Sequence, residues 1–221
     1  MLTVHHLNNS RSQRVLWLLE ELGLPYEIKR YERDAKTMLA PPALKAVHPL
    51  GKSPVITDGA ATLAETGAIV ETICEAYAGG RLRPAAGTVD RLRWTYWMHY
   101  AEGSAMPPLL MKLVFTALPQ RAPGLMRGLV KAVSNSALKG FVDPQLKSHF
   151  DYWEAELGKS AWFAGDAFSA ADIMMSFPIE AAADRAGALE GRPRLAAFLK
   201  TIHARPAYQA ALAKGGPYAY A

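Results

Sequence analysis

The chain has 221 residues, of which 50% are hydrophobic and 20% charged, and its formal net charge at pH 7 is +5. This composition predicts a globular protein with one large domain or two small ones, and the single cysteine, Cys74, excludes a disulfide framework or a metal site built on thiolates. No stretch reaches the ~20 apolar residues of a membrane helix, and "MLTVHHLNNS" lacks the pattern of a secretory signal. We therefore expect a protein of the reducing cytoplasm, with no insertion into a membrane.

The excess positive charge is concentrated in one segment. Residues 103–142 contain no Asp or Glu, and the basic residues there match the whole net excess: Lys112, Arg121, Arg127, Lys131 and Lys139. Nucleic acid, an acidic membrane surface or an anionic small molecule could bind such a segment. The basic residues are spread among Leu, Val, Met and Pro, without dense clusters or interleaved aromatic residues. This pattern favours an apolar helix pair with solvated Lys and Arg over a nucleic-acid surface.

The first part of the chain predicts alternating strands and helices. In order, we expect a strand at residues 2–7, a helix at 14–24, a strand at 26–31, a loop or broken helix at 36–49, hairpin strands at 54–58 and 61–64, and a helix from Thr66. Gly23 and Pro25 would stop the first helix. The last helix would place Ile69, Val70, Ile73 and Tyr77 on one face. This order predicts a small α/β domain with a mixed sheet over residues 1–78.

Gly, Pro and Ala interrupt the pattern at residues 79–87, which predict a linker. The remainder, residues 88–221, predicts an all-helical domain, with helices at 89–103, at 141–158, from Ser169 onward and at 192–208. We expect Asp143 and Pro144 to begin the second of these, and Ser169 and Asp172 to form a capping box. Pro178 should kink or end the third. In the fourth, we expect four residues to face inward: Leu195, Phe198, Leu199 and Ile202.

The most informative stretch is "GKSPVITDGAATLAETGAI", residues 51–69. Pro54 holds Ser53 extended, and an Xaa-Pro bond at a strand start can be cis, which would leave the Ser53 backbone able to pair with a peptide-like ligand. The helix that begins near Glu65 and Thr66 presents free N–H groups that attract a carboxylate. The Thr66 hydroxyl is a further donor, and the Glu65 carboxylate can hold an ammonium group. Glutathione, with its γ-glutamyl end, has all these groups.

These residues carry a family resemblance. "GKSPVI…LAETGAIVETI" resembles the glutathione-binding segment of the cytosolic glutathione S-transferases, and "NNSRSQRVLWLLEELGLPYE" resembles their first strand–helix junction, in a Ser-type branch like those of bacteria and fungi. "FSAADIMM" and "RPAYQAAL" are typical of the helical domain of that family. The resemblance implies a thioredoxin-like amino-terminal domain, an all-helical carboxy-terminal domain, a homodimer and a role in detoxification. It implies glutathione as the co-substrate and no metal.

The resemblance also implies roles for individual residues in binding glutathione. Pro54 would be a cis-proline, and the Ser53 backbone would pair with the cysteinyl part of glutathione. Glu65 and Thr66 would hold the γ-glutamyl group, and Lys52 could meet the glycine carboxylate.

Ser10 is the residue that the resemblance places at the thiol. A hydroxyl donor and a helix amino terminus both stabilise a thiolate, and the spacing of Ser10 matches the catalytic serine of Ser-type members. The first 25 residues contain no Tyr and no Cys, so the Tyr-type and Cys-type arrangements are excluded. Arg11 could add positive charge beside the sulfur. Ser10 is also a good helix N-cap, and Asn9 or Ser12 could activate the thiol in its place.

The co-substrate is expected to be an electrophile with an apolar part, bound between the domains. Family placement suggests a pocket lined by Met106, Pro107, Leu110, Tyr100 and His99, and Tyr96 and Glu102 could line the pocket or meet the partner subunit. A glutathione-dependent peroxidase or disulfide reductase would use the same site. A non-catalytic binding protein with the same fold is the alternative from another class.

Three other candidates have structural interpretations. His5 and His6 lie side by side in a strand and point to opposite faces, so a shared metal is not expected. Cys74 is expected to be a core thiol, and Asp172 a capping residue.

Overall fold

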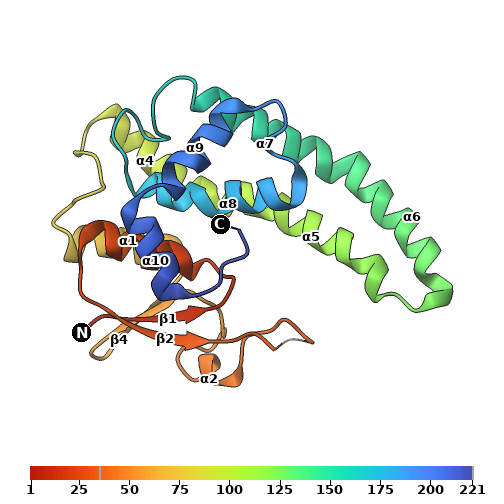
Figure 1. Ribbon diagram of the computed structural model, residues 1–221, viewed down its shortest axis with the longest axis horizontal. Helices are drawn as coiled ribbons and strands as arrows, with labels where there is room; N and C mark the ends of the chain where they lie inside the picture. Colours follow the sequence, from red (N-terminus) through yellow and green to blue (C-terminus); the bar gives the residue numbers. More distant parts are fainter. Residues whose placement is uncertain (35, 221) are drawn as a thin grey trace.

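The structure, a computed structural model, describes residues 1–34 and 36–220. Figure 1 shows a sheet with its helices on one side of the molecule and a larger bundle of helices on the other, with a long helical arm that projects from the bundle. The mixed sheet with its helices in the first part and the all-helical second part agree with the prediction. The single helix expected at residues 192–208 is wrong, because the chain breaks between His203 and Pro206 and a further helix follows. Between Tyr77 and Val89 the chain forms no helix or strand, and the expected linker at residues 79–87 lies in that interval.

One mixed sheet has the strand order β2-β1-β3-β4. Its strands are β1 (Thr3–Leu7), β2 (Glu27–Tyr31), β3 (Val55–Asp58) and β4 (Ala61–Ala64). β1 pairs in parallel with β2 and antiparallel with β3, and β3 and β4 form the expected hairpin. A parallel pair requires a crossover, which α1 (Ser12–Leu22) provides. The crossover places the start of α1 directly after the end of the central strand β1.

The helices of the first part end for local reasons. α1 stops at Gly23, whose φ of 62° suits glycine, as the sequence predicts. α2 (Pro42–Lys45) is one short turn, and α3 (Thr66–Thr72) continues into a π turn at Ile73–Tyr77. The expected inward position of Tyr77 is wrong, because its side chain is 38% exposed and its hydroxyl donates to Asp58. The π turn adds a residue to the turn and so rotates Tyr77 away from the buried face.

The second part contains seven α-helices among the described residues. They are α4 (Val89–Tyr100), α5 (Met106–Arg121), α6 (Arg127–Ala137), α7 (Asp143–Glu156), α8 (Ala170–Ala186), α9 (Pro193–His203) and α10 (Pro206–Gly215). A short 3-10 turn at Gly124–Met126 joins the α5 end to α6. The four residues expected to face inward on α9 are all buried.

Two π turns join four of these α-helices into two long, continuous helices. Residues Ala101–Ala105 join α4 to α5, and residues Leu138–Val142 join α6 to α7. α7 begins at Asp143 with Pro144 in its first turn, as expected, but the π turn before it makes the helical chain continuous through this start. A proline clashes with the carbonyl four residues before it, and a wider π turn at that place relieves the clash, so Pro144 is tolerated.

Pro178 likewise does not end α8, which continues to Ala186. A proline has no N–H to offer the carbonyl four residues earlier, here Met174. The Nη1 atom of Arg14 donates to that carbonyl at 2.8 Å. Arg14 belongs to α1, so a side chain from the first part completes the hydrogen bonding of a helix in the second.

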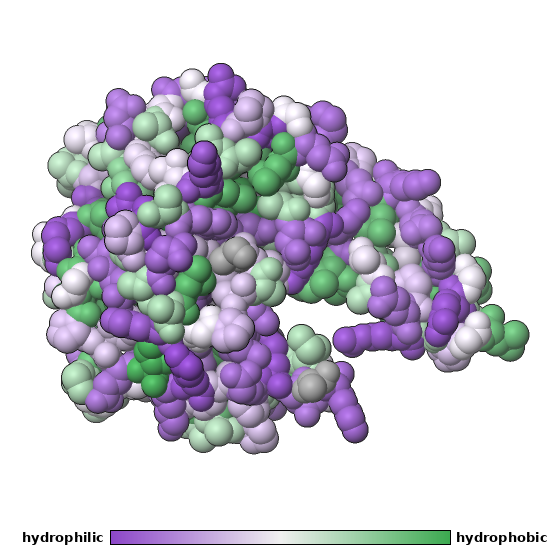
Figure 2. All heavy atoms as spheres, viewed as in Figure 1, coloured by the Kyte–Doolittle hydropathy of each residue, from purple (hydrophilic) through white to green (hydrophobic). Residues whose placement is uncertain are grey.

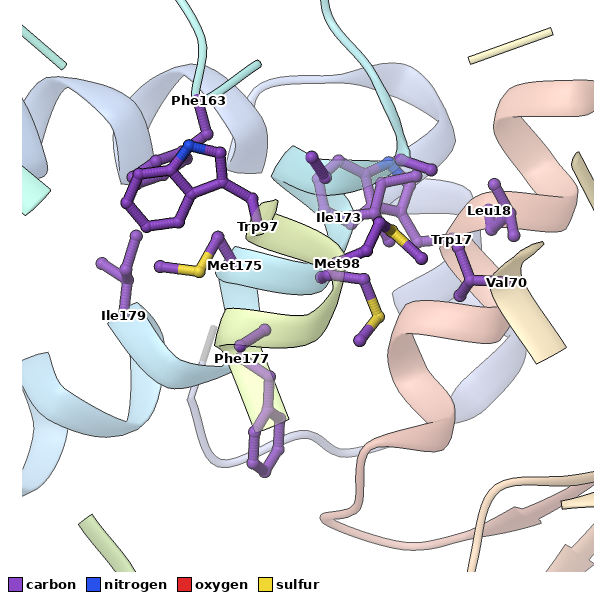
Figure 3. Packing of buried hydrophobic residues seen from close by; sticks show 14 of the residues in the cluster. Trp17, Leu18, Val70, Trp97, Met98, Phe163, Ile173, Met175, Phe177 and Ile179 are labelled. Atoms are coloured by element: carbon purple, nitrogen blue, oxygen red, sulfur yellow. The ribbon is translucent and has the colours of Figure 1, made fainter. Parts of the chain in front are cut away.

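The two parts share one hydrophobic core. Figure 3 shows Trp17 and Leu18 of α1 beside Ile173 of α8, with Trp97 and Met98 of α4 close by. Trp17 is 1% exposed, and its ring meets that of Tyr208 on α10 edge-on at 5.1 Å. Burial of side chains of this size contributes about 1.5–3 kcal/mol each, so this contact fixes α1 against the bundle.

The acid-free segment lies mainly in the projecting arm of α5 and α6. The two helices pack against each other along the arm, and Figure 2 shows hydrophobic and hydrophilic residues mixed toward its tip. Its exposed apolar side chains include Leu113, Leu118, Leu125, Leu129 and Val133. No helix among residues 1–34 and 36–220 is long and apolar enough to cross a membrane.

Candidate functional site

Two adjoining cavities open where β1 meets α1. One of about 390 Å³ lies beside Ser10, and one of about 360 Å³ lies beside Glu65 and Thr66. The residues that line both are Arg11, Leu50, Lys52 and Ser53. The two cavities are therefore continuous enough to receive one elongated ligand.

Ser10 lies at the start of α1 and faces the larger cavity. Its Oγ atom is 2.7 Å from that of Ser12 and 3.3 Å from that of Ser53, and it accepts a hydrogen bond from the Ser12 backbone N–H at 3.3 Å. The Ser10 hydroxyl thus satisfies an amide at the amino terminus of α1, and its own hydrogen is donated to a neighbouring hydroxyl, that of Ser53 or Ser12. To donate to a ligand in the cavity, the hydroxyl has to rotate away from these partners. The expectation that Ser10 is the N-cap of α1 is wrong, because Arg11 occupies that position, although the Ser10 hydroxyl still accepts from the Ser12 N–H.

Behind Ser10, a histidine orients the neighbouring hydroxyl. Burial lowers the pKa of His6 to about 4, and a hydrogen bond to the Gly215 backbone opposes this shift only in part, so the ring is neutral at pH 7. His6 Nδ1 lies 2.8 Å from the Ser12 hydroxyl, and the tautomer of the neutral ring determines which of the two donates. Ser12 is completely buried and lines neither cavity, and Asn9 lines the larger one with its Oδ1 bonded to the Ala219 N–H. Of the three candidates, Ser10 alone combines access to the cavity with a hydroxyl.

Arg11 joins the two parts of the chain at the site. Its Nε atom lies 2.9 Å from a carboxylate oxygen of Glu102, in the π turn that follows α4, and Arg14 binds the other oxygen. Burial acts to raise the pKa of Glu102, but Arg14 and then Arg11 outweigh it, and the pKa is lowered. Glu102 lines the smaller cavity, so a carboxylate that remains ionised lies opposite Glu65 and Thr66.

The peptide bond between Ser53 and Pro54 is cis, as expected. The ladder between β1 and β3 begins at Val55, so Ser53 lies outside it, at the cavity wall. The Ser53 hydroxyl donates to the His5 carbonyl at 3.0 Å and accepts from the Leu7 N–H at 3.3 Å. These bonds hold the loop against β1 and bring Ser53 next to Ser10.

Glu65 has an unusual backbone. Its φ is 73°, in a region that residues other than glycine rarely occupy. Residues with such backbone conformations cluster at functional sites. It precedes α3, and among the described residues no side chain caps that helix. Thr66 is 4% exposed and lines the smaller cavity together with Glu65. The first N–H groups of α3 are therefore without a side-chain partner beside this cavity.

The structure brings together all the residues predicted for catalysis and glutathione binding: Ser10, Arg11, Lys52, Ser53, Pro54, Glu65 and Thr66. It does not bring the predicted co-substrate residues to them, since neither cavity is lined by Met106, Pro107, Leu110, Tyr100 or His99. Tyr100 is in the core, where burial raises its pKa and its hydroxyl accepts from Trp153 Nε1 at 3.0 Å. Leu110 is 55% exposed on α5.

Residues that sequence reasoning missed line the larger cavity instead. Phe177 reaches it from α8, and Met38, Leu39 and Arg33 reach it from the loop after β2. No local pattern distinguishes these residues from ordinary core or loop residues. Arg33 follows the predicted strand at residues 26–31, in a loop beside the first strand–helix junction. This position is the feature of the sequence that could have indicated it.

His5 and His6 bond in different directions, as predicted, with His5 Nδ1 2.9 Å from the Tyr31 hydroxyl and His6 Nδ1 2.8 Å from the Ser12 hydroxyl. No cluster of potential metal ligands occurs in the part of the chain that the structure describes. The structural roles predicted for Cys74 and Asp172 are confirmed. Cys74 is buried, and Asp172 accepts from the Ser169 N–H at 2.9 Å in a capping box.

Comparisons with known proteins agree with this geometry. Residues 10–76 match the family described as glutathione S-transferase, N-terminal domain, and residues 105–206 match glutathione S-transferase, C-terminal domain. A curated relative, glutathione S-transferase 3 of Schizosaccharomyces pombe, is 35% identical over 97% of this chain and 88% of its own length. The chain therefore belongs to the glutathione S-transferase family, enzymes that take glutathione as co-substrate.

Solved structures show the same fold. A glutathione S-transferase from Actinobacillus pleuropneumoniae is 30% identical, with a TM-score of 0.79, over 97% of this chain and 93% of that one. A sphingomonad glutathione S-transferase, solved in complex with glutathione, is 25% identical, with a TM-score of 0.72, over 97% and 98% of the two chains.

Proposed function

We propose that this chain binds glutathione across the two cavities and activates its thiol at Ser10. The observation that carries the proposal is the meeting of Ser10, Ser53 and the Glu65–Thr66 pair around continuous space. The γ-glutamyl carboxylate would take the free N–H groups of α3 and the Thr66 hydroxyl, and its ammonium group would meet Glu65. The cysteinyl backbone would pair with Ser53, and the glycine carboxylate would meet Lys52. The glutathione complex of the sphingomonad relative supports the same ligand.

In this arrangement the sulfur lies at Ser10. A free thiol has a pKa of about 8.5, and only the thiolate is the nucleophile. The Ser10 hydroxyl can donate to the sulfur, and the start of α1 and the Arg11 guanidinium add positive potential, so the thiolate is favoured over the thiol. The thiol proton leaves to solvent, the sulfur lone pair forms a bond to the electrophilic carbon, and the leaving group departs with its electron pair.

Reduction of a peroxide or of a disulfide would start from the same thiolate. A non-catalytic binding protein is the alternative that the site favours least, because the open cavity retains an accessible hydroxyl and an uncapped helix. Turnover with an aryl halide, an organic hydroperoxide and a mixed disulfide, measured side by side, separates these reactions. We further propose a homodimer that acts in the cytoplasm in detoxification, as the family resemblance implies.

Calorimetry tests glutathione binding directly. We expect wild type to bind glutathione at millimolar or lower concentration, and Thr66→Val to bind it at least 10-fold more weakly, because a buried charge-assisted hydrogen bond is worth about 1.5–3 kcal/mol. Cys74→Ala is the matched control, since Cys74 is buried and lines neither cavity. Absence of glutathione binding by wild type would rule the proposal out.

A further inference from the structure

The cavity beside Ser10 carries more positive charge than glutathione needs. We propose that the co-substrate is an anionic electrophile, a molecule with an apolar body and a carboxylate or sulfonate group, and that Arg33 binds its anionic group. This inference rests on the proposed function and names the class of substrate for the same site.

The charged residues that line the larger cavity are all basic. Four basic residues line it, Arg11, Arg33, Lys45 and Lys52, and none of its described lining residues is acidic. Arg11 shares the single Glu102 carboxylate with Arg14. The other three have no carboxylate within 4.0 Å among residues 1–34 and 36–220.

Glutathione accounts for only part of this charge. Its γ-glutamyl end belongs to the smaller cavity, with Glu65 and Thr66, so the larger cavity receives the thiolate and the glycine carboxylate. Lys45 and Lys52 are both exposed and can meet the glycine carboxylate by moving their flexible stems. Arg33 then remains as a cation of the same cavity with no anion assigned to it.

Arg33 is held in place by neutral groups. Its Nε atom donates to the Asn8 carbonyl at 3.2 Å and its Nη1 atom to the Met38 carbonyl at 3.1 Å, while its backbone N–H donates to Asn8 Oδ1 at 3.0 Å. Asn8 lies two residues before Ser10, so the guanidinium is fixed relative to the catalytic hydroxyl. Burial lowers the pKa of Arg33, the Tyr220 side chain opposes this, and the charge of Arg11 lowers it further. A half-buried, immobilised guanidinium is well suited to bind a carboxylate or sulfonate.

Apolar side chains complete the cavity. Phe177 is 6% exposed, while Met38, Leu39 and Leu50 are 52%, 66% and 62% exposed around the opening. Large apolar side chains exposed together at a cavity mouth are typical of ligand sites. They can cover an aryl or alkyl body while Arg33 holds the charged end, and the reacting carbon then faces the sulfur at Ser10.

The test uses two glutathione conjugates that differ in the charge of the aryl group. One is S-(4-carboxy-2,6-dinitrophenyl)glutathione, and the other has a methyl ester in place of the aryl carboxylate. Both are titrated by calorimetry into wild type, Arg33→Gln and Arg121→Gln, with glutathione itself as reference. Arg121 is an exposed cation at the end of α5 that lines neither cavity, so its replacement removes the same charge elsewhere.

We expect wild type and Arg121→Gln to bind the carboxylate conjugate about 10-fold or more tightly than the ester, as one charge-assisted hydrogen bond would give. Arg33→Gln should lose this preference and keep its affinity for glutathione and for the ester. Equal affinity of wild type for the two conjugates, or an unchanged preference in Arg33→Gln, would overturn the inference while glutathione binding stands. Failure of wild type to bind glutathione would overturn the proposed function and this inference with it.

Discussion

Replacement of Arg14 by Met should lower the free energy of unfolding by about 3–5 kcal/mol. Arg14 is 1% exposed and makes two charge-assisted contacts, to the Met174 carbonyl and to Glu102. Loss of the first leaves a buried carbonyl without its partner, which costs about 1–3 kcal/mol. Loss of the second costs about 1.5–3 kcal/mol, at the lower end here, because Glu102 is 30% exposed and keeps Arg11.

The reasoning depends on Pro178, and a double-mutant cycle isolates that dependence. Pro178→Ala gives the helix an N–H for the Met174 carbonyl, so Arg14→Met should cost about 1–2 kcal/mol less in the Pro178→Ala background than in wild type. The free energies come from urea unfolding followed by circular dichroism. A cost of Arg14→Met that is equal in both backgrounds would show that the carbonyl left without a partner by Pro178 does not determine the role of Arg14.

Three further predictions concern buried ionisable groups. The pKa of His6 is about 4 in the folded protein, against 6.5 for an ordinary histidine. The neutral ring therefore contributes its full stabilisation above pH 6.5, and about 3 kcal/mol of the free energy of unfolding is lost as the pH falls to 4. Urea unfolding at several pH values should show this loss in wild type and not in His6→Gln. Burial raises the pKa of Asp172 from 3.8 to about 6, so stability gains about 2 kcal/mol as the pH falls from 6 to 4. A difference from Asp172→Asn that does not change with pH would contradict this. Burial also raises the pKa of Cys74 to about 12, so iodoacetamide should label it at pH 8 only in urea, and labelling of the native protein would refute the assignment as a core thiol.

Most of the first part could be predicted from the sequence because its signals are local. The sequence of β2 alternates, α1 has helical spacing and a glycine stop, and the hairpin of β3 and β4 has Gly59 at its turn, with a φ of 56°. The residues proposed to bind glutathione could be picked out for the same reason, since Ser53, Pro54, Glu65 and Thr66 lie within one short stretch.

The rest depends on contacts between distant residues. In the sequence, Pro178 predicts the end of a helix. α8 continues through it because Arg14, from another helix, donates to the carbonyl that Pro178 leaves without a backbone donor. The π turns before α5 and α7 shift the register of the helices that follow, so spacing alone misplaces their faces. Phe177 and Arg33 come from segments far apart in the chain, and only the packing of α8 against α1 brings them to one cavity.

The central claim, that Ser10 activates the thiol, is tested most directly by the pKa of bound glutathione. Ultraviolet absorbance of the thiolate is titrated against pH in complexes with wild type, Ser10→Ala and Ser134→Ala, the last a buried serine on α6 that is remote from both cavities. We predict a thiol pKa at least one unit below the ordinary ~8.5 in wild type and Ser134→Ala, and a value near ~8.5 in Ser10→Ala. Equal thiol pKa values in wild type and Ser10→Ala, with both binding glutathione, would contradict the claim.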